Sequence, residues 1–139
     1  MDHLAFIREV ARRMACDEKR ADALTFAVLR ELGERLTPKE VSDVTAQMPH
    51  ELRSLLTSLK RPDRPVRRIH AAEFIGEVRK IMSLPDEAEA RRAVMSVFAV
   101  LQKMLGSVSG LEGEAWHVMS QLPKDLKKMW IEAARTTEK

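Results

Sequence analysis

Cysteine, aromatic residues and glycine are scarce in this chain of 139 residues, and each shortage narrows what it can be. A single cysteine, Cys16, allows no internal disulfide and no zinc site built from several thiolates, and it fits a reducing cytoplasm. Tyr is absent and aromatic residues make up only 4%. The remaining residues are dominated by Ala, Leu, Met, Glu, Lys and Arg, which have high helix propensities, so we expect helices throughout.

Long apolar runs are also lacking. No segment approaches the roughly 18 apolar residues that read as a membrane-spanning helix. The first 14 residues alternate charged and apolar side chains and contain no signal-peptide-like core. We therefore expect a cytoplasmic protein without membrane contact.

What is present predicts a folded chain. Hydrophobic residues make up 45% and charged residues 32%, which is typical of a globular domain rather than a disordered segment. The 24 basic and 21 acidic residues give a formal net charge of +3. That small excess permits binding to a polyanion without indicating it.

Apolar residues at helical spacing predict four helices in the first half. The segment Thr37-Pro38-Lys39-Glu40 combines a Thr N-cap, Pro at the first helical position and Glu at the third, which is a capping box. Pro49 prevents simple continuation of the helix that follows. The expected helices run from the N-cap Asp2 to near Cys16, from Asp17 to Gly33, from Thr37 to Met48, and from Pro49 to Leu59.

The second half repeats the first. Three blocks recur in the same order: Phe6-Ile7-Arg8-Glu9-Val10 as Phe74-Ile75-Gly76-Glu77-Val78, Phe26-Ala27-Val28-Leu29 as Phe98-Ala99-Val100-Leu101, and Glu40, Val44, Gln47, Pro49 and Leu52 as Glu114, Val118, Gln121, Pro123 and Leu126. The second set of helices is expected near residues 71–83, 86–105, 111–121 and 124–135. Ser83 is available to cap the second of these.

This duplication predicts the organisation of the chain. We expect an all-α fold in which two four-helix units pack as one pseudo-two-fold bundle; two loosely tethered subdomains are the alternative. The predicted boundaries are residues 1–59 for the first unit, 60–70 for a basic, proline-containing linker, 71–135 for the second unit and 136–139 for a frayed tail.

These duplicated motifs resemble those of a bacterial family catalogued as domain of unknown function 2267. The most specific pieces are Thr37-Pro38-Lys39-Glu40 with Gln47-Met48-Pro49-His50-Glu51-Leu52, and Gln121-Leu122-Pro123-Lys124-Asp125-Leu126. The resemblance covers the chain from about Phe6 to Trp130 and implies an all-helical, cytoplasmic bacterial protein of duplicated origin. It implies no catalytic or ligand-binding residues. Trp116 and the strongly basic linker depart from the typical family pattern.

No motif predicts catalysis or a cofactor. Glu114 and His117 have the spacing of a helical metal-binding pair, but no second Glu-x-x-His is present, so a surface pair is the better interpretation. Glu9 and Glu77 are equivalent carboxylates for which we favour exposed or salt-bridged positions over acid–base work. For Cys16 we favour a small buried hydrophobe over a reactive thiol. The glycine-containing loop from Gly106 to Gly113 matches no phosphate-binding fingerprint and reads as a turn. We expect neither a metal nor an enzyme.

Two surfaces remain as candidate binding sites. Trp116, Met129 and Trp130 could anchor a protein partner, although packing of one or both tryptophans in the core is the stronger alternative. The basic linker could bind a polyanion through Lys60, Arg61, Arg64, Arg67 and Arg68. We favour a non-enzymatic protein that binds a partner, or a second copy of itself, through apolar helix faces. Weak binding of nucleic acid or another polyanion is the alternative.

Overall fold

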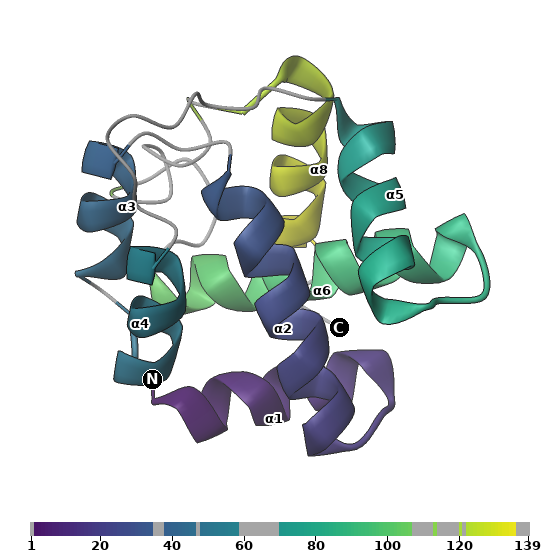
Figure 1. Ribbon diagram of the computed structural model, residues 1–139, viewed down its shortest axis with the longest axis horizontal. Coiled ribbons are helices and arrows are strands. Elements are labelled where there is room, and N and C mark those ends of the chain that lie inside the picture. Colours follow the sequence, from purple (N-terminus) through teal and green to yellow (C-terminus); the bar gives the residue numbers. More distant parts are fainter. Residues whose placement is uncertain are drawn as a thin grey trace.

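The chain is all-α in the computed structural model, which describes residues 2–34, 38–46, 48–58, 70–106, 113, 120 and 122–135 (Figure 1). No strand occurs among these residues, and none of their helices is both long and apolar enough to cross a membrane. The helices are α1 (His3–Met14), α2 (Glu18–Gly33), α3 (Pro38–Thr45), α4 (His50–Ser58), α5 (Ala71–Met82), α6 (Glu87–Met104) and α8 (Lys124–Arg135). The predicted linker, the helix expected over 111–121 and the tail lie largely outside the described residues.

Aspartate caps begin the helices as local sequence predicts. The side chain of Asp2 accepts a hydrogen bond of 2.8 Å from the backbone N–H of Ala5, and Asp17 accepts one of the same length from that of Arg20. The start of α6 differs from the prediction, because Asp86 rather than Ser83 provides its cap, accepting from the N–H of Glu89 at 2.8 Å. Ser83 instead ends α5.

The turns that follow α1 and α5 have the same backbone geometry. Ala15 and Ser83 are both left-handed, with φ 51° and ψ 49° at Ala15 and φ 51° and ψ 47° at Ser83. The next residue donates its N–H back into the preceding helix in each case, from Cys16 to Ala11 O at 3.1 Å and from Leu84 to Arg79 O at 3.0 Å. This is the Schellman arrangement, here built without the glycine that usually occupies the left-handed position.

We expect Ala15→Gly to stabilise the protein by about 0.5 kcal/mol, because relief of the left-handed strain outweighs the extra chain entropy that glycine loses on folding. This corresponds to a rise of about 2 °C in the melting temperature, measured by circular dichroism. The matched control is Ala5→Gly, at an exposed, right-handed position in α1, which should lower stability by about 0.5–1 kcal/mol. A loss of stability in both variants would contradict the expectation.

The core is one continuous cluster that includes buried residues of both predicted units. Helices α2 and α6 cross near the centre of the molecule, and α1 and α5 each pack against both of them (Figure 1). Helix α4 packs on α2, and α8 packs on α6. Phe6 of α1 and Phe74 of α5 are both fully buried. The packing of α1 on α2 and α6 and of α4 on α2 thus has a counterpart in that of α5 on α6 and α2 and of α8 on α6, while the pseudo-two-fold packing itself stays a prediction.

Candidate functional site

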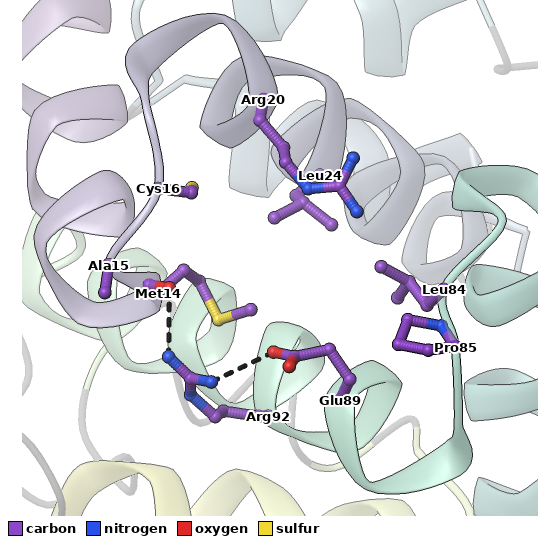
Figure 2. Close-up of a pocket in the computed structure, with 9 residues that line it drawn as sticks. All are labelled: Met14, Ala15, Cys16, Arg20, Leu24, Leu84, Pro85, Glu89 and Arg92. Carbon is purple, nitrogen blue, oxygen red and sulfur yellow. Dashed lines mark hydrogen bonds and ion pairs between the residues drawn. The ribbon is translucent and has the colours of Figure 1, made fainter.

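A pocket of about 450 Å³ lies between the two equivalent corners, where α1 turns into α2 and α5 turns into α6. We call it the corner pocket. Both halves of the chain contribute to it (Figure 2), because its lining comes from α1, α2, the α5–α6 turn and α6. It is lined by Met14, Ala15, Cys16, Arg20, Leu24, Leu84, Pro85, Glu89 and Arg92.

Two arginines of the corner pocket differ in how they are held. The Arg92 guanidinium donates to the backbone O of Met14 at 2.9 Å and to Glu89 Oε1 at 3.0 Å, so it joins α6 to the end of α1 (Figure 2). Arg20 comes from the first turn of α2, and its guanidinium lies beside Leu24, across the pocket from that pair (Figure 2). It forms no ion pair with any residue in the described part of the chain. Among the described residues, the lining of the pocket therefore contains one ion pair, Glu89 with Arg92, and one arginine without an ion pair.

Cys16 lies at the edge of the corner pocket as a partly buried free thiol. Burial raises its pKa above the ordinary value, and the neighbouring carboxylate of Asp17 acts in the same direction, outweighing Arg20 and Arg92. The thiol consequently stays protonated near neutral pH. Cys16 is thus less buried than predicted, and its raised pKa agrees with an unreactive side chain.

A second concavity, of about 670 Å³, lies where the start of α5 meets the outer side of α8. Most of its accessible surface is apolar, because Ile131 and the aliphatic stems of the lysines form much of its wall. The charged ends of the lysines lie around it. We call it the lysine groove, lined by His70, Lys124, Asp125, Lys127, Lys128 and Ile131.

Asp125 links α8 to the start of α5 beside the lysine groove. Its carboxylate accepts the backbone N–H of Ala71 at 2.9 Å and lies 3.5 Å from His70 Nδ1. Partial desolvation opposes ionisation, but these contacts and the N–H of Leu126 keep the pKa of Asp125 below its ordinary value. The three lysines make no ion pair with any residue that the structure describes. Positive charge therefore dominates the groove.

The equivalent place in the first unit, between α1 and α4, has a different charge. A concavity there is lined by Asp2, His3, Leu4, Pro49, His50 and Glu51, with no lysine or arginine among them. His3 of α1 lies between α2 and α4, with Nε2 3.0 Å from Asp22 Oδ1 and Nδ1 3.7 Å from Glu51 Oε2. The two concavities thus lie at corresponding positions of the predicted units, and among the described residues lysines line the one in the second unit but not this one.

The structure corrects the proposed protein-binding role of Met129 and Trp130. Trp130 is fully buried and Met129 is 2% exposed, so neither can touch a partner while the chain is folded. The Trp130 ring packs on Phe98 with centroids 5.1 Å apart, and Gln102 Nε2 donates to the Trp130 backbone O at 2.7 Å. The alternative of core packing is confirmed for Trp130. Trp116 lies outside the described residues.

The polyanion-binding residues of the linker, Lys60, Arg61, Arg64, Arg67 and Arg68, also lie outside the described residues. In the sequence they immediately precede His70, which lines the lysine groove. The basic character of the linker is therefore continuous along the chain with that of the groove.

The two equivalent glutamates have different environments. Glu9 forms ion pairs with Arg12, with Arg13 at 3.3 Å and with Lys103 at 3.9 Å. The hydrogen bond from Arg12, against some desolvation and with help from Lys103, lowers the pKa of Glu9. A salt-bridged role, as expected from sequence, is thus confirmed for Glu9. Glu77 is partly buried and has no ion pair within the described ranges.

The other sequence candidates give no site. Glu114 and His117 lie outside the described residues, and no group of three metal-ligating side chains exists among those described. Gly106, in the turn that follows α6, has a left-handed φ of 76°, and Gly113 has a left-handed φ of 56°. Neither contributes to the corner pocket or the lysine groove.

The residues that line the two concavities were not predicted as site residues from the sequence. Lys124, Lys127 and Lys128 have the spacing of one helical face, a signal that was present in the sequence. These lysines line a groove because the start of α5, with His70, packs beside them, and that contact depends on tertiary packing. Arg20 gave no comparable signal, because it reads as an ordinary exposed residue of a first helical turn.

Comparison with known proteins gives a family without an assigned activity. The sequence model of the family described as "Uncharacterized conserved protein (DUF2267)" matches residues 3–129, which is most of the chain. No curated protein matches the sequence.

Proposed function

The chain belongs to this family of uncharacterized conserved proteins, and we propose that it is a non-enzymatic, cytoplasmic bacterial protein that binds an acidic, amphipathic segment of a partner protein in its lysine groove. The observation that carries the proposal is three lysines that form no ion pair with a described residue around a largely apolar wall, where the described lining of the corresponding concavity of the first unit contains no lysine.

The shape and chemistry of the lysine groove favour a peptide. Lys124, Lys127, Lys128 and Ile131 follow one another at helical spacing along α8, so they present one continuous stripe. A partner helix with apolar residues flanked by Glu or Asp would bury its apolar side on Ile131 and the lysine stems while its carboxylates meet the ammonium groups. Asp125 adds little repulsion, because its charge is already held by Ala71 and His70.

Nucleic acid, the alternative, fits the lysine groove less well. Single strands are bound largely by stacking of bases on aromatic side chains, and the described residues that line the groove include no Phe, Tyr or Trp. Lysine also lacks the planar fork with which arginine reads phosphate and guanine. Polyanion binding by the linker arginines is retained as the second candidate, since their charge adjoins the groove in sequence.

The test uses a fluorescein-labelled, 18-residue helical peptide with one leucine face and one glutamate face. Its controls are a scrambled peptide of the same composition and a single-stranded 20-nucleotide DNA. We expect the amphipathic peptide to bind, and Lys127→Glu/Lys128→Glu to weaken it about tenfold, since two attractive pairs become repulsive. Fluorescence anisotropy at two salt concentrations measures the affinities.

The controls separate the two candidates. Lys19→Glu, at an exposed position in α2, should leave peptide affinity nearly unchanged. Ile131→Ser should weaken the amphipathic peptide more than the scrambled one. Equal binding of both peptides, or tighter binding of DNA that disappears in Arg64→Gln/Arg67→Gln/Arg68→Gln, would support the polyanion alternative. No binding of any probe would overturn both.

A further inference from the structure

The corner pocket has the architecture of a small-molecule site that is separate from the lysine groove. Its walls come from both units, so it exists only when the two are packed together. Its volume of about 450 Å³ lies within the usual range of roughly 300–1,000 Å³ for ligand pockets. Places where two units meet are common positions for such pockets.

Apolar side chains form most of the inner wall of the corner pocket. Met14, Leu24 and Leu84 are buried at 7%, 1% and 6% exposure, so they are fixed by the core and cannot move aside freely. Figure 2 shows these side chains converging on the space between α1, α2 and the α5–α6 turn. Because these side chains are almost completely buried, they expose only a narrow, preformed apolar strip to a hydrocarbon group.

The polar part of the corner pocket is asymmetric in charge. Arg92 is paired with Glu89 and donates to Met14 O, whereas Arg20 lies on the other side of the pocket and forms no ion pair with a described residue (Figure 2). The protonated Cys16 thiol contributes no negative charge. The residues that line the pocket therefore carry a net charge of one positive unit, and the Asp17 carboxylate lies beside Cys16 at its edge.

We propose that the corner pocket binds a small amphipathic monocarboxylate, with its carboxylate on the Arg20 guanidinium and its hydrocarbon part against Met14, Leu24 and Leu84. Guanidinium and carboxylate form paired, charge-assisted hydrogen bonds, which fix the orientation of the ligand. A phosphate dianion suits the pocket less, because Glu89 lies opposite Arg20 and one arginine cannot balance two charges.

The test uses octanoate as the probe and the full chain labelled with ¹⁵N. We expect its addition to shift the amide resonances of Cys16, Leu24 and Leu84 and to saturate at millimolar or lower concentration. Arg20→Gln should weaken octanoate binding at least fivefold, because it removes the charge but keeps a helix-compatible side chain. The matched control is Arg12→Gln, an arginine on α1 that is paired with Glu9, which should bind octanoate as the wild type does.

Two further probes make each outcome decisive. Octanol, with the same chain and no charge, should bind at least fivefold more weakly than octanoate, and inorganic phosphate should not compete. Equal affinity for octanol, competition by phosphate, or absence of shifts at the pocket residues would each overturn the proposal. Binding that is lost in Lys127→Glu/Lys128→Glu but kept in Arg20→Gln would place octanoate in the lysine groove, and would also overturn it.

Discussion

Trp130→Ala is expected to lower the free energy of unfolding by about 3–5 kcal/mol, the range for removing a large aromatic side chain from a packed core. The ring is fully buried between α8 and α6 and continues a chain of edge-to-face contacts, 5.1 Å to Phe98 and from there 5.9 Å to Phe74. Alanine would leave a cavity beside Phe98 and remove one of these aromatic pairs. Domains of this size have total stabilities of about 5–15 kcal/mol, so the variant would be only marginally folded.

Urea unfolding followed by far-ultraviolet circular dichroism measures this loss of stability. With a slope of about 2 kcal/mol per molar urea, the midpoint should fall by about 1.5–2.5 M. Trp130→Phe is the matched variant, since it keeps an aromatic ring against Phe98 and should lose much less. Lys128→Ala, on the exposed side of α8, should change the midpoint very little. Wild-type stability in Trp130→Ala would mean that the ring is not in the core, and would restore the interpretation of Trp130 as a surface anchor.

Features that depend on neighbouring residues were predictable from the sequence. The caps at Asp2 and Asp17 require only an acceptor two or three residues before a free N–H, and both formed. The cap of α6 was predicted wrongly, and the reason is physical. Ser83 and Asp86 are both good cap residues, and the left-handed turn at Ser83 used that residue to end α5 instead.

Features that depend on tertiary packing were not predictable in the same way. Helix α8 contains Met129, Trp130 and Ile131 in succession, and these point in different directions around the helix. Which of them is buried depends on the side of α8 that meets α6, and the structure buries the first two and leaves Ile131 partly exposed. The lysine groove has the same origin, because His70 reaches α8 only through the fold.

The last prediction concerns whether the two units unfold together. Phe6→Ala removes a fully buried ring from α1, in the first unit, and should destabilise the protein by about 3–5 kcal/mol. Helix α1 packs on α6 as well as on α2, and one continuous core joins the units. We therefore expect the free energy of unfolding of the second unit to fall by the same amount as that of the first. Phe74→Ala, at the equivalent position of α5, should have the same effect.

The two tryptophans, Trp116 and Trp130, both belong to the second half of the chain, so their fluorescence reports unfolding there while circular dichroism reports all helices. In Phe6→Ala the two signals should shift to the same lower urea midpoint in a single transition, which is the mark of two-state unfolding. If the units were loosely tethered, fluorescence would keep its wild-type midpoint and circular dichroism would show two transitions. Coincident transitions would also mean that the corner pocket, lined by both units, forms only in the fully folded chain.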